Sequence, residues 1–416
     1  MALENLTSPD TLIVLTFAKA GLGHLRVAYA LMEGLPKGAR VSLFSSLDST
    51  TTFMHRLSSN NPVFRELAEA LQYGVAERVF TSIYTHILRL RAKALQPQVE
   101  AMLTGLKPSP KRVVFVSTHF GLAHQISAIK PDLEAEGFEV KLVVVVTDDS
   151  PQQAWSVPGA DLTIVPSRLT GLRLGAPHTE VVHYPLSLKL GHELKESKFE
   201  YKFKQAQAQS KVKIKVSLPV SGAAVGLDFY RELAMRLNEL ESRFRFYVTS
   251  RDSAYTKQFL AEMGKLAYTE VYSHSYDRLV VVGYEKVMQK NTLALEVTKP
   301  SEQAFKALYT PRQTGGVILL FTQPVGRQEY DNLWFLARNN LIPSKEEQER
   351  LWARDKSVIA KAKKWRGIPL MANPKKSAEF IQWCLKAGVF EKMMSSPRKP
   401  KSDGVRDIWS LVDGAL

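Results

Sequence analysis

The chain has 416 residues, of which 45% are hydrophobic and 23% are charged, and this composition excludes disordered and fibrous proteins. Its formal net charge of +15 favours an anionic partner such as an anionic membrane surface or a phosphorylated substrate. The sequence shows no zinc-finger, RNP or helix-turn-helix pattern, so we do not expect the protein to bind nucleic acid. The N-terminus lacks the pattern of a signal peptide, and no stretch approaches about 18 apolar residues, so we expect a cytoplasmic protein without a membrane-spanning helix.

Apolar runs in the first half alternate with longer amphipathic segments, which is typical of a parallel sheet covered by helices on both faces. The predicted strands are Thr11–Phe17, Val41–Ser45, Arg112–Ser117, Val140–Thr147, Leu162–Ser167 and Glu180–Tyr184. Residues 1–188 are therefore predicted to form an N-terminal α/β domain.

A second series of the same kind begins at Val212 and predicts a second α/β domain at 212–390. Further strands are expected in Arg245–Ser250, Arg278–Tyr284, Leu293–Thr298 and Gly316–Thr322, with helices at Phe229–Leu240 and Tyr330–Asn339. The lysine-rich segment 189–211 has no clear apolar stripe and is predicted to be a linker. The single cysteine, Cys384, is expected to be a buried apolar residue, and 391–416 to form a basic tail and a terminal segment that docks again. The predicted fold is α/β, with two doubly wound, Rossmann-like domains facing across a cleft.

The turn after the first strand contains Gly21, Gly23 and His24 and leads into an amphipathic helix. Small residues there leave backbone N–H groups able to meet an anion, with His24 at the helix entry. A tight turn whose histidine merely caps the helix is an equally good interpretation of these residues alone.

Two more strands of the first domain end in polar residues. Thr118 and His119 follow one strand, and Thr147, Asp148 and Asp149 follow the next. A histidine and an aspartate at neighbouring strand ends are candidates for a general base and its orienting carboxylate. Since no spaced set of ligands accompanies Asp148, we expect metal-free chemistry.

The second domain has three comparable turns. Ser221, Gly222 and Gly226 lie between a strand and a helix, where backbone can approach a phosphate, although the Walker lysine is absent. Thr298, Lys299, Ser301 and Glu302 follow a buried strand, and Gln328, Glu329 and Asn332 share one helical turn after the next strand; such groups suit ribose and sugar hydroxyls. Each set also has an ordinary explanation, as first-turn charges favoured by the helix dipole or as a solvated helix face.

Taken together, these residues resemble the GT-B glycosyltransferases, within them the group of monogalactosyldiacylglycerol synthases, processive diacylglycerol glucosyltransferases and the lipid-linked N-acetylglucosaminyltransferase of peptidoglycan synthesis. The matches follow the family's order along the chain. They are Gly21-Leu22-Gly23-His24, Ser117-Thr118-His119, Thr147-Asp148 with Trp155, Asp161 through Pro166-Ser167, Thr298-Lys299, and Gln328-Glu329 with Asn332.

The resemblance implies an inverting, metal-independent hexosyltransferase that moves a sugar from a nucleotide diphosphate-sugar, with UDP as the family's usual nucleotide, to a lipid or polyprenyl acceptor. It implies that His24, His119 and Asp148 are catalytic, that Gly21, Gly23 and Thr118 face the acceptor, and that the second-domain turns bind the donor. No cofactor is expected, because the nucleotide-sugar is a substrate. A nucleotide-sugar epimerase or hydrolase of the same fold, and a non-catalytic binding protein, are the alternatives.

A helix predicted around residues 75–93 carries Val75, Val79, Ile83, Ile87 and Leu90 on one side, with Arg78, Arg89 and Lys93 along another. Such a helix can lie on an anionic bilayer, or it can pack on the first domain's sheet. The first alternative predicts a peripheral protein on the inner face of the cytoplasmic membrane.

Overall fold

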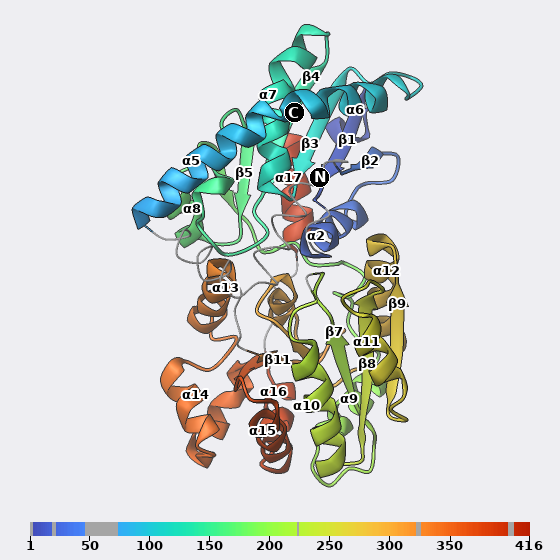
Figure 1. The fold of residues 1–416 in the computed structure, drawn as a ribbon, viewed down its shortest axis with the longest axis vertical. Helices are drawn as coiled ribbons and strands as arrows, with labels where there is room; N and C mark the ends of the chain where they lie inside the picture. The colour runs from blue at the N-terminus through green and yellow to red at the C-terminus, as the bar shows by residue number, and fades with distance from the viewer. Residues whose placement is uncertain (1–2, 19–21, 46–73, 223, 322–325, 398–402) are drawn as a thin grey trace. The chain divides into compact units, whose positions relative to one another are not determined.

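The computed structural model describes the chain except for residues 1–2, 19–21, 46–73, 223, 322–325 and 398–402 (Figure 1). Its contacts divide the chain into two compact units. The first unit comprises Met1–Leu188, Gly326–Gln328 and Ser402–Leu416, and the second comprises Lys189–Val325 and Glu329–Lys401. Residues 189–211, the predicted linker, thus group with the second unit, and most of the terminal segment groups with the first.

The first unit is built on a six-stranded parallel sheet in the order β2-β1-β3-β4-β5-β6. Ile13 pairs in register with Val41 on one side and with Val114 on the other. The strands are β1 (Thr11–Thr16), β2 (Arg40–Phe44), β3 (Arg112–Ser117), β4 (Glu139–Val145), β5 (Leu162–Val165) and β6 (Thr179–Val181). All six predicted strands are confirmed in position. The inner strands are largely buried and therefore read as continuous apolar runs, whereas the edge strands β2 and β6 are partly exposed.

Helices cover this sheet, and α5 packs against α7 and against the short 3₁₀ turn η1. The elements are α1 (Glu4–Thr7), α2 (Leu22–Glu33), α5 (Gly74–Leu90), α6 (Ala92–Thr104), α7 (Phe120–Ala135), η1 (Gln153–Trp155), α8 (Arg168–Leu174) and α17 (Gly404–Gly414). The prediction of a single helix at 75–93 is wrong in one respect: the structure has two helices there, α5 and α6, which are separated at Arg91. Beyond the break, Leu95 and Val99 are buried, whereas the apolar stripe of α5 is exposed, so the apolar side chains of the two helices lie in different surroundings.

The second unit contains another six-stranded parallel sheet, in the order β12-β11-β10-β7-β8-β9. The strands are β7 (Ile214–Pro219), β8 (Phe244–Arg251), β9 (Thr269–His274), β10 (Leu295–Thr298), β11 (Val317–Phe321) and β12 (Gly367–Leu370). The fold is therefore α/β, with two doubly wound, Rossmann-like units, as predicted and as in the two-domain architecture of the GT-B fold.

Sequence reasoning made one wrong assignment and missed two strands in this unit. Arg278–Tyr284 is not a strand but lies within helix α12 (Asp277–Lys290). Its run of three valines suggests a strand, yet Val281, Tyr284 and Met288 are buried at helical spacing. Both missed strands, β9 and β12, lie at the sheet's edges, where β9 is largely exposed and β12 contains Pro369, so neither shows a clear apolar run.

The remaining elements of the second unit are helices and 3₁₀ turns, including the two predicted helices. They are α9 (Glu196–Gln205), α10 (Leu227–Leu240), α11 (Lys257–Gly264), η2 (Glu302–Leu308), α13 (Arg327–Arg338), α14 (Lys345–Trp352), η3 (Lys356–Lys364), α15 (Pro374–Lys386) and α16 (Val389–Met394). The segment 189–211 is anchored rather than extended, because Lys202 and Gln205 of α9 are buried.

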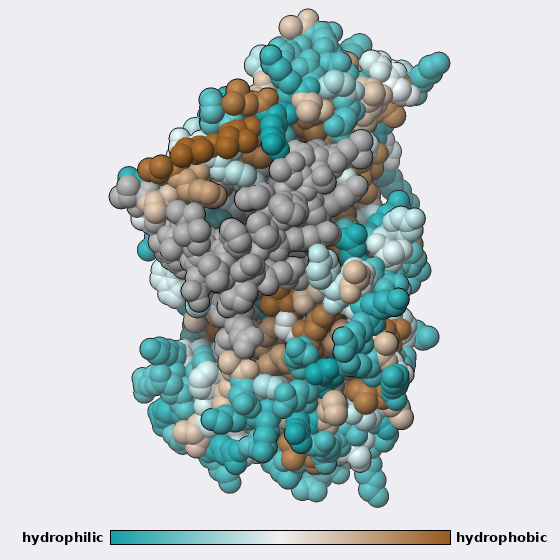
Figure 2. All heavy atoms as spheres, in the orientation of Figure 1, coloured by the Kyte–Doolittle hydropathy of each residue, from teal (hydrophilic) through white to brown (hydrophobic). Residues whose placement is uncertain are grey.

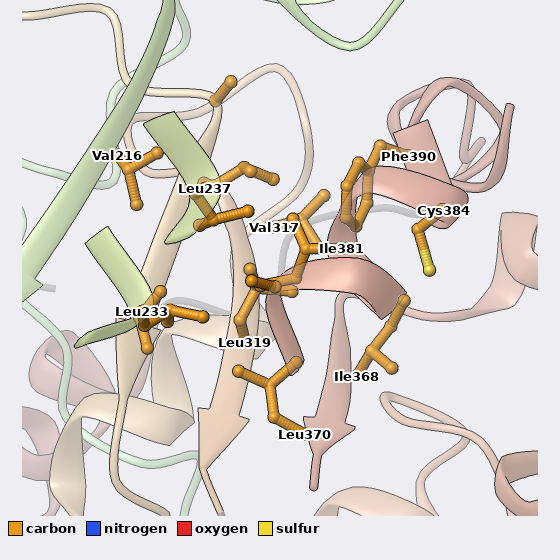
Figure 3. Packing of buried hydrophobic residues seen from close by; sticks show 14 of the residues in the cluster. Val216, Leu233, Leu237, Val317, Leu319, Ile368, Leu370, Ile381, Cys384 and Phe390 are labelled. Atoms are coloured by element: carbon orange, nitrogen blue, oxygen red, sulfur yellow. The ribbon is translucent and has the colours of Figure 1, made fainter. Parts of the chain in front are cut away.

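The core of the second unit joins β7, β11 and β12 to α10, α15 and α16 (Figure 3). Leu233 and Leu237 of α10 point toward Val317 and Leu319 of β11, with Ile381 of α15 beside them. Cys384 lies in this cluster as well, and burial raises the pKa of its thiol. The cysteine is therefore a buried apolar residue, as predicted.

The first unit is completed by α17. Trp409 is buried and donates its indole N–H to the carbonyl of Leu31, 2.8 Å away, at the end of α2. A Cβ atom at Gly34 would lie 2.2 Å from Val405 Cγ1, so only glycine lets the helix approach so closely. The prediction that the terminal segment docks again is confirmed.

Candidate functional site

Each sheet has one topological switch point, the place where the connections from two neighbouring strands leave in opposite directions. Ligands of doubly wound sheets bind there, outside the carboxyl ends of the strands. In the first sheet the strand order puts the switch point between β1 and β3, and in the second between β7 and β10. His24, Thr118 and His119 follow β1 and β3, and the turns at 221–226 and 298–302 follow β7 and β10. Sequence-predicted residues therefore border both switch points.

His24 is the third residue of α2 and is half-buried. Its Nδ1 lies 2.6 Å from the carbonyl oxygen of Thr118 and 3.2 Å from Oγ1 of Thr147. A carbonyl only accepts hydrogen bonds, so Nδ1 carries the proton. In the neutral ring the lone pair is then on Nε2, the atom that can act as a base.

Thr118 fixes the position of His24. It is fully buried, and its hydroxyl is shared between the carbonyl oxygens of Thr16 and His24, each 3.0 Å away. The hydroxyl thus connects the end of β1 to the first turn of α2. Thr118 contributes to the site by positioning His24 with both its carbonyl and its hydroxyl.

His119 has the opposite tautomer. It is buried as the N-cap of α7, and its Nδ1 accepts the backbone N–H of Leu122 at 3.4 Å, so a neutral ring carries its proton on Nε2. The His119 ring meets His24 edge-on at 4.9 Å and stacks on Phe120 at 4.8 Å. Of the two histidines, His24 has the geometry of a base, whereas His119 is buried and caps α7 beside it.

Asp148 and Asp149 follow β4 but differ in burial. Asp148 is half-buried and comes directly after Thr147, whose hydroxyl contacts His24. Asp149 is buried, and its carboxylate accepts hydrogen bonds from the hydroxyls of Ser167 and Thr170 in the first turn of α8. Asp149 therefore anchors α8, and Asp148 remains the candidate at the sheet edge. Gly23 is half-buried in the first turn of α2, whereas Gly21 lies outside the described residues.

In the second unit, the turn after β7 folds back on itself. Ser221 accepts the N–H of Ala224 on its carbonyl at 2.9 Å and that of Val225 on its hydroxyl at 3.4 Å. Gly226 caps α10 with φ +80°, and a Cβ there would lie 2.8 Å from the ring of Phe321. Glycine is required at this position by both backbone conformation and packing. Gly222 is half-buried in the same turn.

The turn after β10 is fastened to α13 by buried polar contacts. Lys299 forms an ion pair with Glu329, and the two side chains are only 8% and 5% exposed. Asn332 is fully buried and donates to the carbonyl of Pro300 at 3.1 Å, while Thr298 is buried at the strand end. The structure thus brings the predicted donor residues after β10 next to those at the start of α13, and it joins Lys299 to Glu329 directly.

The other predicted donor residues lie near these contacts in the chain. Ser301 precedes η2 without capping it through its side chain, and Glu302 accepts a hydrogen bond from the side-chain amide of Gln303 at 3.3 Å. Gln328 is half-buried in the first turn of α13 and groups with the first unit.

A buried charged cluster beneath the 299–302 turn was missed by sequence reasoning. Glu296 of β10 is fully buried and accepts hydrogen bonds from Lys306 of η2, from the hydroxyl of Tyr284 and from the N–H of Gly316. The signal in the sequence is a single carboxylate, Glu296, within an otherwise uncharged buried strand, since a buried charge requires partners. Because Lys306 lies in the last turn of η2, its contact with Glu296 fixes the end of the segment that follows the 299–302 turn.

Among the described residues, no group of three histidine, cysteine, aspartate or glutamate side chains is arranged to hold a metal ion. In the same part of the chain, no helix is long and apolar enough to span a membrane.

The fold and these contacts define a class: a protein with two doubly wound α/β units, each with polar groups at its switch point. Solved structures with some likeness include the UDP-GlcNAc 2-epimerase from Neisseria meningitidis bound to UDP-GlcNAc (10% identity, 97% of this chain and 99% of that chain, TM-score 0.48), MurG from Acinetobacter baumannii (11%, 98% and 100%, 0.45) and a UDP-glucosyltransferase from Polygonum tinctorium (12%, 97% and 99%, 0.47).

No family model matches the chain, and no curated protein does. The assignment of the fold rests on the strand order of the two sheets, because likenesses at these identities and scores decide nothing about activity.

Proposed function

We propose that the protein is an inverting, metal-independent glycosyltransferase that moves a sugar from a nucleotide diphosphate-sugar to the hydroxyl of a lipid-type acceptor. The observation that carries the proposal is the 2.6 Å distance between Nδ1 of His24 and the carbonyl oxygen of Thr118, which assigns the proton to Nδ1 and the lone pair to Nε2. A base fixed at the switch point of a doubly wound sheet suits the deprotonation of a hydroxyl nucleophile.

In the proposed reaction, Nε2 of His24 takes the proton of the acceptor hydroxyl as its oxygen attacks the anomeric carbon. A new carbon–oxygen bond forms on one face of the sugar while the bond to the nucleotide diphosphate breaks on the other. The diphosphate leaves with the electron pair, and the configuration at the anomeric carbon is inverted. Asp148 is proposed to orient the reacting groups, and backbone N–H groups in the turns after β7 and β10 to hold the diphosphate.

The donor side of the proposal is supported by the second switch point. The turns at 221–226 and 298–302 flank it, and Lys299, Glu329 and Asn332 hold the second turn against α13. A pre-organised turn holds its polar groups in place without reorganisation when a ligand arrives. UDP-sugars are the first donors to test, on the basis of the sequence resemblance.

Membrane association is supported by α5. Val79, Ile83 and Leu90 are 56%, 58% and 65% exposed, so the stripe lies at the surface instead of on the sheet. Figure 2 shows hydrophobic side chains following α5. Arg78 and Arg89 of α5 and Lys93 of α6 are also exposed, although Lys93 lies beyond the break in the helix. The side chain of Val75 lies outside the described residues.

The function is tested by incubating the protein with radiolabelled sugar nucleotides, with and without membrane lipid. Label in the lipid fraction is expected. Free sugar or an epimerised nucleotide-sugar in both incubations would replace the proposal with a hydrolase or an epimerase, and unchanged donor would indicate a binding protein.

Membrane association is tested by flotation with anionic and neutral vesicles at low and high salt. Binding to anionic vesicles at low salt is expected, with about 1 kcal/mol lost per cation removed in a triple Gln variant of Arg78, Arg89 and Lys93. A triple Gln variant of the exposed Lys356, Lys363 and Lys364 in the second unit removes the same charge and is expected to float normally. Equal loss in both variants would show a nonspecific effect of net charge.

A further inference from the structure

Aromatic rings connect the exposed surface of α5 to His24 within the first unit. Phe80 stacks on Tyr84 with ring centroids 6.0 Å apart, and Tyr84 meets Phe120 edge-on at 6.2 Å. Phe120 contacts Trp155 at 5.6 Å, and Trp155 lies 6.5 Å from the His24 ring. These rings come from α5, α7, η1 and α2, so the tertiary fold assembles them.

The rings of this series differ in exposure. Phe80 is 46% exposed, Tyr84, Phe120 and His24 are half-buried, and Trp155 is 3% exposed. The first three rings therefore share a partly open surface, while Trp155 lies beneath it as part of the core. A surface of this kind can cover one side of a bound chain without entering the core.

The position of η1 is fixed independently of any ligand. Glu77 of α5 is buried and accepts the backbone N–H of Gln153 at 3.1 Å, and His124 of α7 lies 3.0 Å from the carbonyl of Ala154. Both contacts hold the segment that carries Trp155 against α5 and α7. The spacing of the rings is thus built into the fold.

The chemistry of the rings favours an apolar occupant. Sugar hydroxyls require paired donors and acceptors, which Phe80 and Phe120 lack. Phe80 also adjoins the exposed aliphatic side chains Val79 and Ile83 of the same helix, and its contact with Tyr84, which meets Phe120, extends this apolar stripe to α7. Burying apolar chain against such rings is favourable in proportion to the area removed from water.

We infer that Phe80, Tyr84 and Phe120 form an acceptor track, along which the apolar chain of the acceptor lies with its hydroxyl end at His24. The inference rests on the proposed function and deepens it by naming the acceptor class: an amphiphile whose long alkyl or isoprenoid chain begins close to the reacting hydroxyl. The track selects acceptors by chain length.

The test measures binding without catalysis. Radiolabelled alkyl β-glucosides with chains of four, six and eight carbons, kept below micelle formation, are bound to the protein by equilibrium dialysis. The affinity of the wild-type protein is expected to rise by up to about fourfold for each methylene group that reaches the rings.

Three variants locate the effect. The double variant Phe80→Ala/Tyr84→Ala is expected to bind the four-carbon glucoside as the wild type does and to lose most of the dependence on chain length. Leu172→Ala removes a side chain of α8 that is 72% exposed and is expected to keep that dependence. Phe120→Leu, which retains apolar volume, checks the position of the track without relying on α5, and it is expected to weaken binding of the longest glucoside.

Equal affinity for all three glucosides, or a length dependence that survives in the double variant, would overturn the track. These outcomes are independent of the proposed activity, because no donor is present. Sugar transfer without a length dependence removes the track and keeps the transferase, whereas length-dependent binding that is lost in the double variant, without transfer, does the reverse.

Discussion

The two switch points are constructed in different ways. At the first, two histidines and several aromatic rings surround the strand ends, and His24 is held by the backbone carbonyl of Thr118. At the second, the strand ends are fixed by the buried ion pair of Lys299 with Glu329 and by the hydrogen bond of Asn332 to Pro300.

The difference indicates a division of labour. Imidazole can exchange a proton near neutral pH, whereas a buried ion pair keeps its charges and its geometry. The first switch point thus has the components of a reacting centre, and the second those of a rigid turn. Four predictions test this contrast, beginning with the largest expected effect.

Replacing His24 by alanine is expected to lower turnover by roughly 10²–10⁴-fold, since a missing general base typically costs that much. Binding of the free nucleotide UDP should stay unchanged, because the donor turns are in the other unit. Sugar transfer and UDP affinity are measured on the same preparation. The exposed His86 on α5 gives the matched control, His86→Ala, which should retain normal turnover. Near-normal turnover of the His24 variant would remove the assigned base.

Replacing Lys299 by methionine is expected to destabilise the second unit by about 3–5 kcal/mol, because Glu329 would be left as an uncompensated buried charge. Unfolding in urea, followed by hydrogen exchange within that unit, measures the loss. The double variant Lys299→Met/Glu329→Met should recover part of it. Arg312→Met breaks an exposed pair with Glu196 and should cost only about 0–1 kcal/mol. Similar losses in the two single variants would contradict a rigid, ion-paired turn.

Gly226→Ala is expected to lower the free energy of unfolding by about 1–3 kcal/mol. The backbone there is left-handed, which alanine disfavours, and the new Cβ would lie 2.8 Å from Phe321. Gly388 also caps a helix with a positive φ, +75°, yet has no atom within 4 Å of the new Cβ. Gly388→Ala should therefore be the milder change in urea unfolding. If the two variants lose the same stability, the close packing of the turn on Phe321 has no energetic weight.

The smallest effect concerns pH and the first unit. Burial lowers the pKa of His124, whereas in the unfolded chain the pKa is about 6.5. Below that value the unfolded state binds more protons, so the stability of this unit should fall as the pH decreases through 6.5 toward the lowered pKa, by at most about 1.4 kcal/mol per pH unit.

The measurement for His124 is urea unfolding between pH 7.5 and about 5, conditions chosen around the unfolded pKa. His124→Gln should flatten the profile, since glutamine does not titrate. The exposed His86, replaced in the same way, should leave the slope in place. An unchanged slope in the His124 variant would show that other groups cause it.

Most of the architecture could be predicted from the sequence, because parallel strands buried on both faces are continuous apolar runs. The edge strands β2 and β6 were still found, but β9 and β12 were missed, since β9 is largely exposed and β12 is a four-residue strand that contains Pro369. Val280, Val281 and their neighbours show the converse error, since β-branched residues in a row were assigned to a strand although their burial has helical spacing.

The candidate site could be predicted only where side chains follow strands. His24, Thr118 and His119 were found in that way, and the strand order brings them together. The role of the Thr118 carbonyl is invisible in a sequence, since any residue has one. The cluster of aromatic rings was missed, although Trp155 is part of the family resemblance, because Phe80, Phe120 and Trp155 come from separate segments of the chain and are joined only by the packing of α5, α7 and η1.

The return of α17 to the first unit has a consequence for biosynthesis. Trp409 packs at the end of α2, and Asp413 accepts the backbone N–H of Leu6, so this unit is assembled from residues more than 400 positions apart. During synthesis, the first unit can be completed only after the second unit has been translated, because α17 follows the second unit in the chain. A chain that ends before residue 404 lacks α17 and so leaves uncovered the part of α2 that Trp409 packs on; such a truncation is expected to destabilise the N-terminal unit more than the second unit.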